Sequence, residues 1–290
     1  MKVLVIGNGF LGSEIIKLFG SNDFDVMVVS RSFNPGFVGK KIEGDFLKQD
    51  LINHALEWAP DVVIQTAWIT DHKKYLNDPL NKDYASFTID LANRIVNTKV
   101  KHLVVLGSAA EYGQQATPIV AGATSLSPES FYAEQKIRAF KSIYEIFKDN
   151  DKQLTWGRVF QPYGSGQDEQ RLIPHLIKSM KTKSPIRLEN PNSCLDWISS
   201  RDVASAILWA TCNKLPVELD ICTGIGTSNL DVLKTVQIAL GLPDIDPSQL
   251  DLNYDEPPKN VVAASNSPIF ISGWRPSDLF SDGVRWAVNS

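Results

Sequence analysis

The first half of the chain alternates short apolar runs, rich in β-branched residues, with longer segments of helical period. The runs expected to form strands are Lys2–Ile6, Asp25–Ser30, Val62–Gln65, His102–Leu106 and Gln153–Val159. Runs that are apolar throughout are typical of strands buried on both faces, hence of a parallel sheet with helices on each side. Helices are predicted over residues 81–99 and 129–148. The expected fold class is therefore α/β, with a doubly wound parallel sheet.

The pattern changes after residue 160. Turn-rich stretches at 161–166 and 189–193 alternate with single helices, which predicts a smaller and less regular lobe. We expect a sheet domain over residues 1–160, to which a segment at about 196–223 returns, and a C-terminal lobe over 161–290. The tail from Asp251 to Asn266 is interpreted as a surface loop before a last helix near 277–288.

Composition excludes several classes of protein. The 290 residues include 43% hydrophobic side chains, enough for a full core. The 29 basic and 33 acidic side chains are well mixed, unlike those of a nucleic-acid binder. Apolar runs fall short of the ~20 residues that span a bilayer, and the chain reaches Gly7 too soon for a signal peptide, so we expect a cytoplasmic protein. Cys194, Cys212 and Cys222 lack metal-ligand spacing and are expected to be buried.

The first predicted strand is followed directly by the glycine pattern Gly7-Asn8-Gly9-Phe10-Leu11-Gly12, which opens the first predicted helix. This is the context in which G-x-G-x-x-G binds a dinucleotide. Gly7 permits the tight turn, Gly9 lets backbone amides approach a pyrophosphate, and Gly12 lets the helix pack against the strand. The N-terminal domain is therefore predicted to bind a dinucleotide.

The end of the second predicted strand bears on which nicotinamide cofactor fits. NAD-binding domains usually place an acidic side chain there to hold the ribose 2′-hydroxyl, but this chain has Ser30 and Arg31. Ser30 leaves room for a 2′-phosphate, and Arg31 offers charge-assisted hydrogen bonds or stacks on adenine. NADP(H) is thus favoured, with NAD(H) and a solvated arginine as the alternative. Asp45 is either an acceptor for the adenine amino group or an ordinary turn residue.

A candidate catalytic set follows from spacing. Tyr132 and Lys136 stand four residues apart, hence on one face of a predicted helix. An ammonium beside a phenol favours phenolate, so the tyrosine could exchange a proton with a carbonyl or an alcohol near neutral pH. Ser108 lies just past the strand at 102–106, where open α/β sheets place their ligands, and would hydrogen-bond the same oxygen. The alternative is a surface pair with a turn serine.

Together these residues resemble the extended short-chain dehydrogenase/reductases, in particular their nucleotide-sugar epimerase/dehydratase/reductase group. The resemblance covers nearly the whole chain and is also carried by residues 60–67, 107–113, 158–164, 195–198 and 273–276. It implies a Rossmann domain with a smaller substrate-binding lobe, and hydride transfer with Tyr132 as acid/base, Lys136 also on the nicotinamide ribose, and Ser108 on the reacting oxygen. The predicted cofactor contacts are Gly7, Gly9, Phe10, Leu11, Gly12, Ser30, Arg31, Asp45, Phe46, Ala67, Lys136 and Phe160.

Departures from the group's motifs narrow the expected chemistry. The 4,6-dehydratases carry an acid and a base immediately after the hydroxyl residue, where this chain has Ala109 and Ala110. Glu111 stands one place late and is expected to face away. Reductases that also epimerise C3 and C5 use a cysteine and a histidine where this chain has Ala109 and Arg171. Dehydration and 3,5-epimerisation are therefore disfavoured, and 4-keto reduction or 4-epimerisation survives.

Other departures concern the substrate. Ser86, Gln161 and Leu195 stand near or at positions where the group usually has asparagine, asparagine and arginine. Arg171 is either a contact to sugar or diphosphate or a solvated residue at a helix start, and Trp68 would stack on a sugar or narrow the pocket. The predicted substrate contacts are thus Trp68, Ser108, Gln161 and Arg171. The four histidines share no spacing, so we assign none to metal or catalysis.

The sequence thus predicts an NADP(H)-dependent oxidoreductase that reduces a 4-keto nucleotide sugar. A 4-epimerase that retains its NAD(P) is the runner-up, and a non-catalytic dinucleotide-sensing Rossmann module is a third reading. Relatives commonly dimerise through the two long helices, here 81–99 and 129–148, and Phe131, Ile143 and Phe147 lie partly off the stripe that faces the sheet. We therefore expect a homodimer, with no nucleic-acid or membrane partner.

Overall fold

The computed structural model describes residues 1–48, 50–69, 71–72, 74–116, 118–245, 250–255 and 257–290. Its centre is a seven-stranded sheet in the order β10-β6-β5-β4-β1-β2-β3, in which every neighbouring pair is parallel. The strands are β1 Lys2–Ile6, β2 Asp25–Ser30, β3 Lys40–Glu43, β4 Val62–Gln65, β5 His102–Ser108, β6 Gln153–Val159 and β10 Glu218–Ile221. Strand order reverses between β1 and β4, the point at which such sheets bind ligands. The predicted α/β, doubly wound fold is confirmed.

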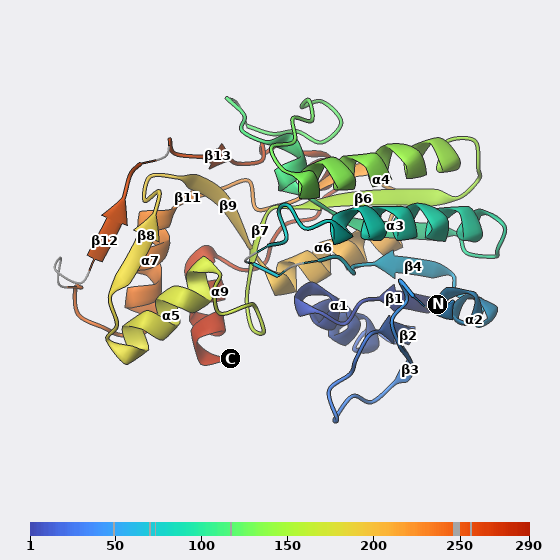
Figure 1. The fold of residues 1–290 in the computed structure, drawn as a ribbon, viewed down its shortest axis with the longest axis horizontal. Helices are drawn as coiled ribbons and strands as arrows, with labels where there is room; N and C mark the ends of the chain where they lie inside the picture. The colour runs from blue at the N-terminus through green and yellow to red at the C-terminus, as the bar shows by residue number, and fades with distance from the viewer. Residues whose placement is uncertain (49, 70, 73, 117, 246–249, 256) are drawn as a thin grey trace.

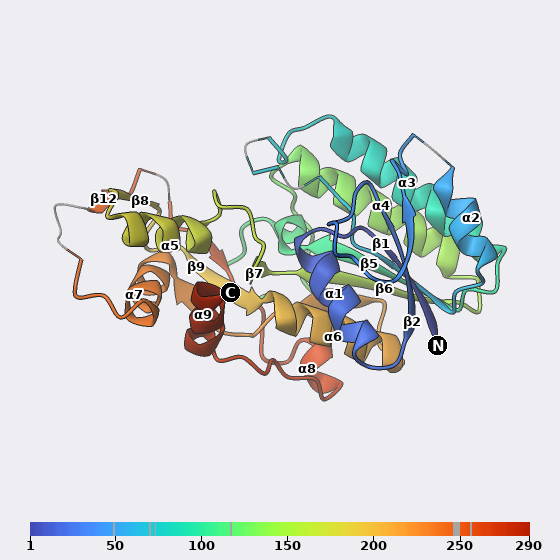
Figure 2. The same ribbon diagram turned by 90° about the horizontal axis from the view of Figure 1, so that it is seen from below.

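Helices cover both faces of this sheet, as Figures 1 and 2 show. One face carries α1 (Phe10–Gly20) and α6 (Ser200–Cys212), and the other carries α2 (Leu51–Glu57), α3 (Leu80–Val96) and α4 (Phe131–Phe147). Each face packs on its own apolar cluster, so the strands are buried on both sides as their unbroken apolar sequence predicts. A short 3-10 helix, η1 (Ala109–Tyr112), follows β5 directly.

Two residues behind the homodimer prediction lie in the core of the chain itself. Ile143 is 0% exposed and Phe147 is 4% exposed, and both pack in the cluster beneath α3 and α4. The sequence pattern misplaced them because α4 packs against both α3 and the sheet and therefore buries a wider stripe than a surface helix does. The homodimer stays a prediction, without support from these two side chains.

The smaller lobe lies to one side of the sheet domain (Figure 1). It contains the strands β7 Gln161–Tyr163, β8 Ile186–Glu189, β9 Cys194–Ser199, β11 Gly226–Ser228, β12 Leu250–Asn253 and β13 Asn260–Val261. Its helices are α5 Leu172–Thr182, α7 Asn229–Ala239 and α9 Phe280–Asn289, and a short α8 (Pro268–Ile271) contacts β10. Strand β9 pairs with β7, β11 and β13, so it is the centre of this lobe.

The structure corrects two expectations for the C-terminal half. The tail at 251–266 is not a simple surface loop, because β12 pairs with β8 and β13 pairs with β9; residue 256 lies outside the described residues. Strands β8 and β9 have backbone groups that need partners, and the tail supplies them. Of the three cysteines, only Cys222 is buried, whereas Cys194 is half-buried and Cys212, the last residue of α6, is exposed. In the described residues, the helices are too short or too polar to cross a membrane.

Candidate active site

The glycine loop after β1 is held by steric limits on its backbone. Gly7 has φ +107°, and its amide donates to the carbonyl of Val29 at 2.8 Å. A Cβ on Gly12 would lie 2.2 Å from the Gly7 carbonyl oxygen, so only glycine fits there. The Thr66 hydroxyl lies 3.1 Å from the carbonyl oxygens of Ile6 and Gly7 and fastens the loop to the end of β4.

Gly9 differs from the other two glycines, because a Cβ there would meet no atom within 4 Å. It is the N-cap of α1, whose first amides lack partners from a capping side chain. Open space beside free amides at a helix N-terminus fits a pyrophosphate. Phe10 and Leu11, in the first turn of α1, are half-buried, and Leu11 packs on the core. The residues present therefore fit a dinucleotide cofactor.

The end of β2 has no carboxylate of its own. Ser30 is 9% exposed and the side chain of Arg31 is exposed. Burial raises the pKa of the Tyr84 phenol; the charge of Arg31 opposes this shift and that of Asp45 adds to it. The Asp45 carboxylate accepts the Leu47 amide at 3.2 Å, as a turn aspartate does. Phe46, predicted to contact cofactor, is buried against the rings of Tyr84 and Phe87.

Ser108, Tyr132 and Lys136 come together at the C-terminal end of β5. Ser108 is the last residue of β5 and the N-cap of η1. Tyr132 is in the first turn of α4, which Ser130 caps by accepting the Ala133 amide. The ammonium of Lys136, one turn later, donates to the carbonyl of Leu106 at 2.6 Å.

Burial decides the protonation of this pair. It raises the pKa of Tyr132 well above its usual range; Tyr75 and Glu111 act in the same direction, and the Ser108 hydroxyl and Arg171 act against it. Burial also lowers the pKa of Lys136 to about 7, although the charge of Glu111 opposes that shift. These shifts oppose the phenolate that the spacing of Tyr132 and Lys136 led us to expect, because desolvation disfavours the charged form of each group. The catalytic roles of Tyr132 and Lys136 stay predictions.

The indole of Trp68 packs beside Tyr132 and Lys136. Its indole Nε1 donates to Asn81 Oδ1 at 2.8 Å, and its ring stacks on Tyr84 with 5.8 Å between centroids. The Lys136 ammonium lies 3.8 Å above the indole, and the Tyr132 ring meets it edge-on at 6.3 Å. Trp68 thus contacts the candidate catalytic pair and is 7% exposed, and its part in substrate binding stays a prediction.

Tyr75 and Arg171 complete the surroundings of Tyr132. The rings of Tyr75 and Tyr132 are 5.2 Å apart and nearly perpendicular, and the Arg171 guanidinium lies 4.8 Å over the Tyr75 ring. Arg171 is the N-cap of α5, so the smaller lobe reaches the site through it. The sequence marked Arg171 as a candidate, but Tyr75 lies in an irregular segment whose pattern gives no sign of it.

The remaining predicted residues lie in several environments. Ala67 is half-buried and donates its amide to the Ile6 carbonyl at 3.0 Å, whereas Phe160 is 3% exposed and belongs to the core. Gln161 begins β7 and Leu195 is in β9, both half-buried. Ser86, near which the group's usual asparagine is replaced, is exposed on α3 and accepts a hydrogen bond from Arg138.

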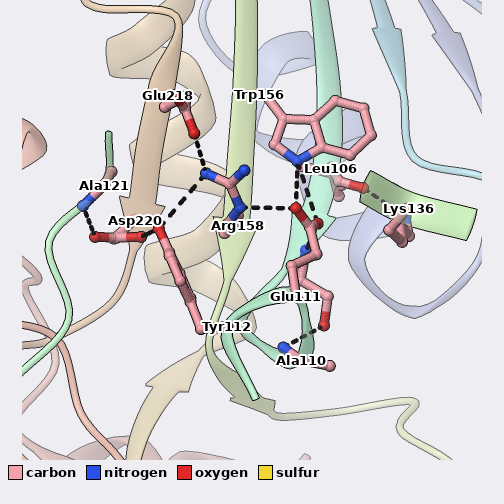
Figure 3. A network of polar contacts seen from close by, with 11 residues as sticks. Leu106, Ala110, Glu111, Tyr112, Ala121, Lys136, Trp156, Arg158, Glu218 and Asp220 are labelled. Atoms are coloured by element: carbon pink, nitrogen blue, oxygen red, sulfur yellow. Dashed lines mark hydrogen bonds and ion pairs between the residues drawn. The ribbon is translucent and has the colours of Figure 1, made fainter. Parts of the chain in front are cut away.

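Glu111 is fully buried and turns into the sheet domain (Figure 3). Its carboxylate accepts the Ser108 amide at 2.8 Å, the Trp156 indole Nε1 at 3.1 Å to each oxygen, and Arg158 Nε at 2.7 Å. Arg158, also fully buried, reaches Glu218 on β10 through Nη1 at 2.7 Å. Local sequence patterns do not predict this network, because its members are far apart along the chain.

Comparison with known proteins agrees with this geometry. Residues 3–218 match the NAD dependent epimerase/dehydratase family. The chain belongs to that family. Over 310 aligned positions it is 25% identical to a Methanocaldococcus jannaschii protein named "Putative UDP-glucose 4-epimerase", with 100% of this chain and 97% of the relative covered. The match confirms the resemblance to the extended short-chain dehydrogenase/reductases, and the protein is an NAD(P)-dependent enzyme of that type.

Solved structures of the epimerase/dehydratase family share the fold. A Thermus thermophilus UDP-glucose 4-epimerase in complex with NAD superimposes with a TM-score of 0.86 at 22% identity, covering 100% of this chain and 98% of that one. A Bacillus anthracis dTDP-glucose 4,6-dehydratase in complex with NAD gives 0.83 at 18% identity, covering 100% and 96%. A Methanobrevibacter ruminantium UDP-N-acetylglucosamine 4-epimerase gives 0.87 at 21% identity, covering 99% and 97%.

Proposed function

We propose that the protein is an NADP(H)-dependent reductase of a 4-keto nucleotide sugar. The observation that carries the proposal is the end of β2, where Ser30 and an exposed Arg31 stand in place of a carboxylate that would repel a 2′-phosphate. An exposed guanidinium can bind that phosphate through two hydrogen bonds and release it to solvent after each turnover. A reductase must release its oxidised cofactor after each turnover, whereas an epimerase keeps its cofactor bound throughout.

The candidate catalytic set performs the proton transfer of such a reduction. When bound at the glycine loop after β1, a reduced nicotinamide cofactor would supply the hydride for C4. Tyr132 carries its proton near neutral pH and gives it to the carbonyl oxygen as the alkoxide develops. The Ser108 hydroxyl holds the same oxygen, and the Lys136 ammonium stabilises the phenolate that remains. Because its pKa is about 7, Lys136 can then pass its proton to that phenolate near neutral pH.

The residues after Ser108 support reduction over dehydration. Elimination of water across C5 and C6 needs a base for the C5 proton and an acid for the leaving hydroxyl. Ala109 and Ala110 provide neither, and Glu111 is engaged inside the fold with Ser108, Trp156 and Arg158. We therefore infer that no dehydratase activity accompanies the reductase.

A 4-epimerase is the second candidate, favoured by the name of the Methanocaldococcus jannaschii relative. An epimerase oxidises and re-reduces the same carbon, keeps its nucleotide bound, and shows no net consumption of it. The two candidates therefore differ in what happens to the cofactor rather than in the catalytic set.

The experiment that tests the proposal incubates the protein with NADPH and a panel of 4-keto nucleotide sugars while the absorbance of the reduced nicotinamide is followed. We expect one NADPH consumed for each sugar reduced. Interconversion of C4 epimers with cofactor that stays bound would replace the reductase by the epimerase. A cytoplasmic homodimer belongs to the same proposal; fractionation of its cells tests the location, and light scattering that returns the mass of a single chain would contradict the dimer.

A further inference from the structure

Glu111 joins the end of β5 to β6 at the position where Ser108 leaves the sheet. It is fully buried, and its two carboxylate oxygens accept from the Ser108 amide, the Trp156 indole and Arg158 Nε (Figure 3). A Cβ on Gly107 would lie 2.7 Å from Glu111 Oε1 and 2.4 Å from Trp156 Nε1. The carboxylate therefore packs directly against the strand backbone beside Ser108.

The end of β5 is held from two directions. Lys136 on α4 binds the carbonyl of Leu106 at 2.6 Å, and Glu111 binds the amide of Ser108 at 2.8 Å, two residues further along the strand. Ser108 also caps η1, because its Oγ accepts the Ala110 amide at 3.2 Å while the Glu111 side chain accepts the cap amide. A shift of Glu111 would consequently move the backbone that carries the Ser108 hydroxyl.

Burying a carboxylate at this position destabilises the fold unless its charge has a function. The desolvation free energy of a buried ion pair is often as large as the attraction between its charges, and apolar residues of similar volume stabilise a fold equally well or better. Arg158 has a second carboxylate in Glu218, and its Nη2 has no hydrogen-bond partner among the described residues. The pairing of Arg158 alone therefore does not account for a carboxylate at position 111.

We propose that Glu111 is a positioning residue of the reaction, which fixes Ser108 at the end of β5 and places a negative charge at the same strand end that Lys136 binds. The proposal rests on the proposed function for the identity of the catalytic set. Its electrostatic part agrees with the direction in which Glu111 acts, since it raises the pKa of both Lys136 and Tyr132.

The other charged and titratable groups around this pair are few in the described residues. Tyr75, from the segment before α3, acts on Tyr132 in the same direction as Glu111, and Arg171, from α5, acts in the opposite direction. Arg158, on β6, binds the far side of Glu111, and Trp68, at the end of β4, is uncharged. Glu111 is the group whose charge acts on both members of the pair.

The test compares Glu111→Gln with Glu218→Gln. Both substitutions remove one carboxylate partner of Arg158, but only the first touches the Ser108 amide. We expect kcat to fall about tenfold in Glu111→Gln with little change in KM, the size seen when a group that orients a reacting residue is lost. The basic limb of its pH profile should move to lower pH by at least about half a unit, because loss of the negative charge lowers the pKa of Lys136, whose ammonium the reaction needs. In Glu218→Gln, kcat and the basic limb of the pH profile should both match those of the unmodified enzyme.

A second readout needs no substrate. Affinity for NADPH is measured against pH, and we expect it to weaken as Lys136 loses its proton, with a midpoint that is absent in Lys136→Met. In Glu111→Gln that midpoint should fall. A folded Glu111→Gln variant with an unchanged midpoint would overturn the electrostatic part of the proposal even if the sugar substrate has been misidentified.

A third variant covers the case in which Glu111→Gln does not fold. Glu111→Asp keeps the charge but is one methylene too short to reach Ser108 and Arg158 together. We expect a fall in kcat of similar size with the pH midpoint close to that of the unmodified enzyme. A kcat equal to that of the unmodified enzyme would show that Glu111 does not position Ser108.

Discussion

At the C-terminal end of β1 the candidate site is made of backbone, whereas at the end of β5, two strands away, it is made of side chains. The first end depends on glycines, with φ +107° at Gly7 and no room for a Cβ at Gly12. The second depends on Tyr132 and Lys136 of α4 and on Trp68, which follows β4 and contacts both of them. A backbone surface is fixed by local sterics, but a side-chain surface needs the whole domain to be packed correctly.

The largest effect is expected at the side-chain end. Tyr132→Phe should reduce turnover at least ~10²-fold, the usual size for a positioned acid or base. NADPH affinity should stay nearly unchanged, because the ring still packs against Tyr75 and Trp68. Steady-state kinetics and a cofactor titration measure the two quantities. Tyr144→Phe, on the exposed part of the same helix, is the matched control. Retained activity in Tyr132→Phe would remove the phenol from the mechanism.

His102, at the N-terminal end of β5, tests whether low pH destabilises the fold itself, apart from any effect on the candidate site. His102 is buried, and burial lowers its pKa to about 4 from the usual 6.5, so it is neutral in the folded protein. Its contribution to stability is present above the pKa of the unfolded chain and is lost as pH falls from 6.5 toward 4. The free energy of unfolding should drop by up to about 3 kcal/mol from this group.

Urea unfolding between about pH 7 and about pH 4 measures that loss. His102→Gln should reduce the pH dependence, while His54→Gln, whose side chain is exposed, should not. Equal pH dependence in His102→Gln and the unmodified protein would show that the pKa of His102 is the same in the folded and unfolded states.

The two ends also differ in how well sequence predicts them. The bounds of β1, β2, β4 and β6 agree with the predicted runs residue for residue, because a strand buried on both faces must be apolar throughout. The glycine loop is predicted equally well, because its turn requires glycine at Gly7 and Gly12. Strands β12 and β13 were missed because they are short and exist through pairing with β8 and β9.

The surroundings of the catalytic pair were predicted least well. Spacing placed Tyr132 and Lys136 on one helix face, but it did not show that burial raises the pKa of Tyr132 and so opposes the phenolate. Nor does local sequence show that Glu111 meets Arg158, 47 residues further along the chain. Such contacts depend on which strands become neighbours, and that information is spread over the whole domain.

The backbone end can be probed with a pair of similar substitutions. In Gly12→Ala the new methyl group would meet the Gly7 carbonyl, so we expect a loss of about 1–3 kcal/mol in stability, the usual result of overpacking. In Gly9→Ala the methyl group enters open space, so thermal stability should be unchanged while NADPH affinity falls, because that space is where a pyrophosphate fits. If Gly9→Ala binds NADPH as tightly as the unmodified protein, the pyrophosphate does not lie over Gly9.

The smallest effect is expected at Arg31, the side chain that we expect to select NADPH over NADH at the end of β2. Arg31→Ala should weaken NADPH about tenfold and leave NADH nearly unchanged, since a charge-assisted hydrogen bond contributes roughly 1.5–3 kcal/mol and an exposed site gives the lower part of that range. Arg31→Lys should fall between the two, because it keeps the charge but loses the two-pronged contact. Arg187→Ala removes the same charge from β8 in the smaller lobe and serves as the control. Titration of both nucleotides gives the ratio of affinities. Equal or tighter binding of NADH by the unmodified protein would contradict the NADP(H) assignment and favour the epimerase.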